Sequence, residues 1–144
     1  MVNITANHEQ RRVLATVPPQ TRWSSFHAET IAVVRASPVL TDYDWIIDDQ
    51  GPMDDVDVKG MADTGEVFRK LASDGDAQTF TVVITSDRFF ATWARVIDKH
   101  YGHRSHYAAP TLEAAAALLN KLSAERNCGS EKNGTADIAR RGVA

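Results

Sequence analysis

The chain has 144 residues, with 16 Lys and Arg against 19 Asp and Glu, so the formal net charge is 16 − 19 = −3. This length predicts one domain, and 43% hydrophobic with 24% charged residues is typical of a globular rather than a disordered protein. No apolar run reaches the roughly 20 residues of a membrane span, the lone Cys128 excludes an internal disulfide, and no basic stripe favours nucleic acid.

The N-terminal third predicts a hairpin and then a helix. Alternating apolar and polar residues at Val2–Thr5 and Arg11–Val17 predict two paired strands, ended by two prolines. Ser24 or Ser25 is expected to cap a helix that ends before Pro38. The expected inner face of this helix is Phe26, Thr30, Val33 and Val34.

The middle of the chain predicts a buried strand and a second helix. The continuous apolar centre of Tyr43–Asp48 indicates a strand covered on both faces. An acidic loop follows, and an apolar stripe then recurs at helical spacing. That stripe is Met61, Gly65, Phe68 and Leu71, and turn residues 73–76 end the helix.

The last third predicts two further strands and two further helices. A strand at Thr79–Thr85 leads to a helix capped by Ser86 or Asp87 and ended by Gly102. The expected main apolar face of this helix is Phe89, Trp93, Val96 and Ile97, with Phe90 and Tyr101 beside it. A short strand at His106–Ala109 precedes a helix at Thr111–Arg126, whose expected inward residues are Leu112, Ala115, Leu119 and Leu122.

The resulting order, β-β-α-β-α-β-α-β-α, predicts an α/β fold with a mixed, mostly parallel sheet and an N-terminal β-hairpin. We assign residues 1–126 to one domain and expect 127–144, which are small, polar and aperiodic, to form a disordered tail. The N-terminus has no signal-peptide pattern, so we expect a cytoplasmic protein.

This order and three segments resemble the bacterial SpoIIAA-like (STAS, or STAS/SEC14-type) domain family. The segments are VNITANHEQRRVLATV, DYDWIIDD, and TVVITSDRFFATWARVID followed by HYAAPTLEAAAALL. The resemblance implies the SpoIIAA-like (STAS) fold and a regulatory, protein-interaction role. It carries no catalytic signature, so we expect a non-enzymatic protein without a cofactor.

Anti-sigma-factor antagonists of the wider STAS family carry a phosphorylated serine or threonine in a turn that opens the second helix. The matching turn here is Asp57-Val58-Lys59-Gly60, in which Lys59 stands where the hydroxyl would be. Lysine cannot form that phosphate ester. We therefore interpret Asp57 and Gly60 first as helix-entry residues, with a surviving regulatory role as the alternative.

The acidic segment 48–57 holds five aspartates just past a predicted parallel strand, where open α/β sheets bind ligands. Asp48, Asp49 and Asp57 are weak candidates for a metal site, because hard cations prefer clustered carboxylates. A degenerate receiver-like domain is a second alternative, although the chain lacks the receiver's acidic pair and its lysine. A solvated acidic loop is the favoured interpretation.

Other reactive side chains form no complete set. His100, His103 and His106 are spaced three apart, but Gly102 separates the first two, so zinc is disfavoured. Lys99, His100 and Arg104 are interpreted as cations at a helix C-terminus. Ser86 and Asp87 lack a nucleophile elbow, and no glycine-rich phosphate loop is present.

The four aromatics of the third helix exceed what one stripe needs, so some are expected at a surface or pocket. The interaction or ligand candidates are Asp57, Lys59, Gly60, Phe89, Phe90 and Trp93. The leading hypothesis is a protein partner, with a homodimer as one form of it. The second is a carrier or sensor of a small lipophilic ligand.

Overall fold

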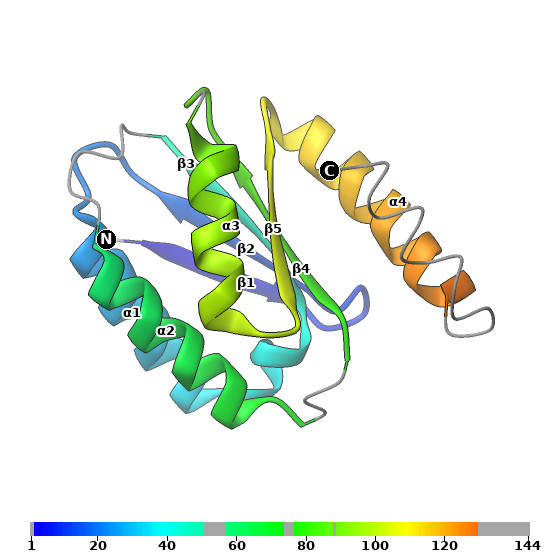
Figure 1. The fold of residues 1–144 in the computed structure, drawn as a ribbon, viewed down its shortest axis with the longest axis horizontal. Coiled ribbons are helices and arrows are strands. Elements are labelled where there is room, and N and C mark those ends of the chain that lie inside the picture. The colour runs from blue at the N-terminus through cyan, green and yellow to red at the C-terminus, as the bar shows by residue number, and fades with distance from the viewer. Residues whose placement is uncertain (1, 51–56, 74–76, 88, 130–144) are drawn as a thin grey trace.

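The computed structural model describes residues 2–50, 57–73, 77–87 and 89–129, and it confirms the α/β class (Figure 1). Its five strands form one sheet in the order β1-β2-β3-β4-β5. The strands are β1 (Asn3–Asn7), β2 (Arg12–Val17), β3 (Asp44–Asp49), β4 (Thr79–Ile84) and β5 (Arg104–Ala109). The helices are α1 (Trp23–Ala36), the 3-10 helix η1 (Pro38–Asp42), α2 (Val58–Leu71), α3 (Phe90–Tyr101) and α4 (Leu112–Gly129).

The sheet is antiparallel only at its N-terminal hairpin, where β1 pairs with β2. The pairs β2–β3, β3–β4 and β4–β5 are parallel. The expected two-sided burial of β3 is confirmed: Trp45 and Ile47 belong to one core and Ile46 to the other. Helices cover both faces, because α1, α2 and α3 lie on one side and α4 on the other (Figure 1).

The start of α1 differs from the expectation. The helix begins at Trp23 with Arg22 as its N-cap, and no side chain makes the capping hydrogen bond. Ser24 and Ser25 lie inside the first turn, so neither is the cap. Trp23 and Phe26 are buried with their rings 5.1 Å apart, edge to face. The helix therefore begins two residues earlier than a Ser24 cap would place it, and this aromatic pair packs its first turn into the core.

Two helices of the same layer, α2 and α3, approach each other closely at Gly65. A Cβ built there would lie 2.7 Å from the carbonyl carbon of His100 and 3.0 Å from its Cβ. At this crossing α2 therefore needs a residue without a side chain at position 65. The predicted inner stripe of α2 is confirmed at Met61, Gly65 and Phe68.

The helix α4 covers the opposite face of the sheet. Its apolar side chains pack on the strands, and its last turn is held by an ion pair. Ala115, Leu119 and Leu122 are buried as predicted, but Leu112 is 48% exposed, which corrects its expected inward position. Leu112 is the first residue of the helix. The helix also continues to Gly129, past the predicted end, while residues 130–144 lie outside the described residues.

A bidentate ion pair fixes the last turn of α4. The two terminal nitrogens of Arg126 lie 3.1 and 3.2 Å from the two carboxylate oxygens of Asp44, at the start of β3. Asp44 is buried and also accepts the backbone N–H of Phe80 at 3.0 Å. The pair thus ties the helix to two neighbouring strands.

Within the described ranges, none of the helices combines the length and the apolar character that crossing a membrane would require.

Candidate functional site

The carboxyl ends of β2 to β5 meet at one edge of the sheet, which we call the carboxyl edge. Its described residues are 17–25, 48–50, 57–60, 84–87, 89–90 and 109–114. The first turns of α1 to α4 all lie there, because each helix follows a strand that ends at this edge. Open α/β sheets present their binding sites at such an edge.

Exposed apolar side chains concentrate at the carboxyl edge. Four large apolar side chains are exposed in the described part of the chain, and three of them begin helices there. Phe89 is 71% exposed, Leu112 48% and Val58 47%. The fourth, Val39, lies on η1. Three separate strand–helix units therefore each present one apolar side chain to solvent.

Phe89 owes its position to the turn before α3. Asp87 accepts the backbone N–H of Phe89 through its Oδ1 at 2.9 Å, so Asp87 organises the turn but is not the N-cap. Phe89 itself is the N-cap residue, and Phe90 begins the helix. Phe90 is 1% exposed in the core, together with Ala94 and Ile97.

This phase corrects the expected face of α3. The inner stripe runs from Phe90 through Ala94 and Ile97, while Phe89 points to solvent instead of joining it. Trp93 lies one turn after Phe89, half-buried against the core. Phe89 and Trp93 therefore share one stripe of the helix, and Phe90 cannot contact a partner.

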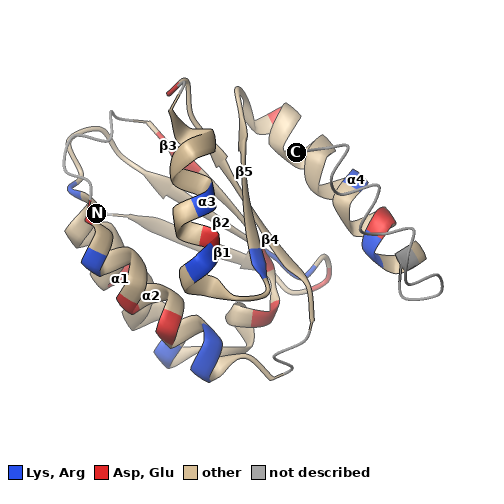
Figure 2. Cartoon of the chain, viewed as in Figure 1, with Lys and Arg blue, Asp and Glu red and all other residues tan. Residues whose placement is uncertain are grey.

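The carboxyl edge is acidic in its described residues. It holds five carboxylates against two cations. The carboxylates are Asp48, Asp49, Asp57, Asp87 and Glu113, and the cations are Arg22 and Lys59. By contrast, Arg69 and Lys70 lie in the last turn of α2 and Lys99 lies in the last turn of α3, at the other end of the layer (Figure 2). The surface at the carboxyl edge therefore favours cationic groups.

The turn that opens α2 is a structural helix entry, as its first interpretation held. The Oδ1 of Asp57 accepts the backbone N–H of Gly60 at 2.9 Å. A Cβ at Gly60 would meet the Asp57 carboxylate and lie 2.7 Å from the Cδ2 of His27, so a larger residue would displace the cap. Lys59 is exposed and lies 3.6 Å from Asp63 in the same helix.

The metal candidates do not come together in the described residues. Asp48 and Asp49 end β3 and Asp57 caps α2, while residues 51–56 between them lie outside the described ranges. No three His, Cys, Asp or Glu side chains of the part of the chain that the structure describes form a group able to hold a metal ion.

The histidine set is also divided. The Nδ1 of His106 lies 2.9 Å from the Oδ1 of Asp98, which also accepts the His106 backbone N–H at 2.8 Å. Burial lowers the pKa of His106 below its usual 6.5, and the hydrogen bond to Asp98 opposes this change. His106 is thus a core residue that joins α3 to β5.

A polar centre that the sequence reasoning missed lies at the opposite, amino edge. The sequence places Arg104 among the cations near a helix C-terminus, but it begins β5 and is 3% exposed. Its terminal nitrogens donate to four neutral oxygens, 2.6–3.1 Å away. The acceptors are the carbonyls of Thr41, Tyr43 and Phe80 and the hydroxyl of Thr81.

Burial lowers the pKa of Arg104 to about 10, and the charge of Asp44 opposes the change. Arg104 also lies 5.1 Å from the ring centre of Phe68. Burial likewise raises the pKa of Tyr101, whose ring packs beside Phe68. The only sequence signal for this centre is a charged residue at the start of a strand. The sequence analysis misses it because it predicts that β5 begins at His106, two residues after Arg104.

The strand order also bears on the receiver alternative. Doubly wound receiver-type sheets have the order 2-1-3-4-5, with all strands parallel. This sheet has the sequential order β1-β2-β3-β4-β5 with an antiparallel first strand, so it differs from the receiver type.

Comparison with protein-family models, with curated proteins and with solved structures gave no match to this chain.

Proposed function

We propose that the protein is a non-enzymatic regulatory module of the SpoIIAA-like (STAS) type, which binds a partner protein through its carboxyl edge. The mixed sheet with its N-terminal hairpin supports the fold part of the proposal. The acidic edge with three exposed apolar side chains supports the binding part. Phosphorylation in the manner of the antagonists is not part of it, because Lys59 replaces the hydroxyl residue.

Phe89 carries the proposal. A phenylalanine 71% exposed leaves most of its apolar surface in water, and fully burying such a side chain contributes about 1.5–3 kcal/mol. Aromatic side chains are enriched at the centres of interfaces. Trp93 follows on the same stripe, so a partner seated on Phe89 would also reach the exposed part of Trp93.

The charges indicate the chemistry of the partner. Five carboxylates against two cations favour a protein surface that presents an apolar side chain among Lys or Arg residues. A second copy docked by the same edge would oppose like charges. The proposal therefore commits to a different protein with a basic, apolar surface.

A photo-crosslinking amino acid at position 89 tests this proposal in the organism that carries the gene. The expected result is one discrete adduct, identified by mass spectrometry as a different protein. Position 39 is the matched control, because Val39 is also a large exposed apolar residue but lies on η1, away from the carboxyl edge. It should give no such adduct.

Three outcomes would contradict the proposal. The first is no adduct from position 89, and the second is the same adduct from positions 89 and 39. The third is an adduct with a second copy of the chain, which would replace the proposed partner with a homodimer.

A further inference from the structure

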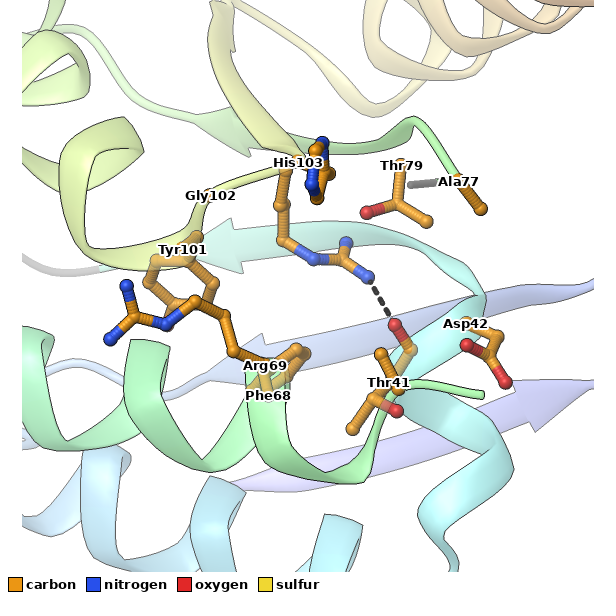
Figure 3. Close-up of a pocket in the computed structure, with 11 residues that line it drawn as sticks. Thr41, Asp42, Phe68, Arg69, Ala77, Thr79, Tyr101, Gly102 and His103 are labelled. Atoms are coloured by element: carbon orange, nitrogen blue, oxygen red, sulfur yellow. Dashed lines mark hydrogen bonds between the residues drawn. The ribbon is translucent and has the colours of Figure 1, made fainter. Parts of the chain in front are cut away.

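A cavity of about 220 Å³ lies at the amino edge of the sheet, which is opposite to the carboxyl edge. Its walls come from η1, the end of α2, the start of β4 and the turn from α3 to β5 (Figure 3). Drug-sized ligands occupy pockets of about 300–1,000 Å³, whereas 220 Å³ equals about seven water molecules at roughly 30 Å³ each. The size therefore suits a small organic molecule.

One part of the cavity wall is apolar. The rings of Phe68 and Tyr101 pack edge to face with their centres 5.3 Å apart. Ala72 and Ala77 continue this wall. A planar or aliphatic body of a few carbon atoms could displace water from these surfaces, which is favourable in proportion to the apolar area covered.

The charged part of the wall has a surplus of cations. Among the residues that the structure describes, this wall contains Arg69 and Arg104 against one carboxylate, that of Asp42. The Asp42 carboxylate already accepts two hydrogen bonds from Ser73, at 3.0 and 2.8 Å. The carboxylate keeps its negative charge, which together with that of Asp44 opposes the lowering of the pKa of Arg104. It offsets one of the two lining arginines, and Arg69 remains in excess.

Arg104 is the buried cation of this wall, and its bonded partners are all neutral oxygens. The nearby carboxylate of Asp44 is held bidentately by Arg126. A buried cation without a carboxylate in contact is costly, and an anion in the cavity would reduce that cost. The lowered pKa of Arg104 reflects the same incomplete compensation.

Arg69 lies at the exposed rim. Its aliphatic stem packs beside Gly102, whose φ of +72° allows the chain to turn there. Among the described residues no short ion pair or hydrogen bond holds its guanidinium, although Arg69, after Lys70, contributes to the lowered pKa of Glu66 on the same helix. Figure 3 shows the side chain extending past Tyr101. A rotation of this long side chain would bring a free cation over the cavity.

We propose that this cavity binds a small organic carboxylate, with its apolar body against Phe68 and Tyr101 and its carboxylate toward Arg69, in the positive field of Arg104. The site does not depend on the proposed docking edge, since no residue is shared between them. Arg69 supplies the direct ion pair, while Arg104, whose terminal N–H groups are engaged, contributes charge. No chemical step is involved.

Benzoate is the probe, with benzamide as its neutral match and inorganic phosphate as an anion without an apolar body. Calorimetric titration of the full chain should give saturable binding of benzoate, at least tenfold tighter than benzamide or phosphate. Amide shifts in an NMR titration should centre on Gly102 and Ala72. Ala77→Trp, at an exposed position of the wall, should abolish binding by filling the cavity.

Arg69→Gln tests the ion pair, and Arg35→Gln is its matched control, an exposed arginine in the last turn of α1. Arg69→Gln should weaken benzoate binding at least tenfold, while Arg35→Gln leaves it unchanged. Absence of saturable binding would overturn the proposal. So would equal affinity for benzamide, tighter binding of phosphate, equal effects of the two arginine variants, or amide shifts centred elsewhere.

Discussion

Replacing Gly65 by alanine tests the packing of the helical layer. The new Cβ would lie 2.7 Å from the His100 carbonyl carbon, and the obstructing atoms belong mainly to the backbone of α3, which cannot rotate away. Inserting a methyl group into such a contact costs about 1–3 kcal/mol. Alanine also gains about 1 kcal/mol over glycine in a helix. Because backbone atoms obstruct the site, we expect the steric cost to exceed the gain in helix propensity. The free energy of unfolding should therefore fall by about 1–2 kcal/mol.

Urea unfolding followed by far-UV circular dichroism would measure this loss, and the melting temperature should fall by roughly 2–8 °C. Ala124→Gly in α4 is the control, because it is exposed and reports helix propensity alone. It should cost about 1 kcal/mol. If Gly65→Ala instead stabilises the protein by the same amount, the close approach of α2 and α3 is refuted.

Three further predictions concern the groups that hold the fold. Asp57→Ala should cost about 1 kcal/mol of unfolding free energy by removing the cap on α2, whereas the exposed Asp63→Ala should change it by less than about 0.5 kcal/mol. Asp44→Asn should destabilise by about 2 kcal/mol or more, because it leaves Arg126 without its bonded carboxylate and removes a negative charge that stabilises the buried Arg104; an unchanged melting temperature would show that the pair is not formed. Since folding lowers the pKa of His106, stability should be full above about pH 6.5 and fall as the pH drops below it. His106→Gln should flatten that fall in melting curves recorded from pH 7.5 to 5, and His100→Gln should not.

The two central strands were predictable because apolar residues dominate their sequences. Tyr43–Asp48 and Thr79–Thr85 each show this pattern, and both form central parallel strands. Pattern alone identifies these segments, since a strand covered on both faces carries mostly apolar side chains.

The phase of α3 was not predictable in the same way. Phe89 and Phe90 have equal hydrophobicity, so composition cannot say which one is buried. The answer depends on Ala94, whose small side chain allows α3 to lie close to the sheet on the Phe90 side. The exposed position of Leu112 was missed for a related reason, because periodicity does not show whether the first turn of a helix contacts the sheet.

The polar centre around Arg104 at the amino edge could not be predicted from the sequence either. Arg104 is buried only because four oxygens from η1, the start of β3 and β4 converge on it. Three of these are backbone carbonyls, which any residue supplies, so no side-chain pattern marks them. The cavity beside Arg104 depends on the same long-range arrangement.

The affinity of the partner captured at position 89 tests the central claim most directly. We predict that Phe89→Ser weakens binding of the purified partner at least tenfold, while Val39→Ser leaves it unchanged, and that added salt weakens binding to the unmodified chain. Equal affinities of the two variants, or binding that salt does not affect, would contradict docking at an acidic, apolar carboxyl edge.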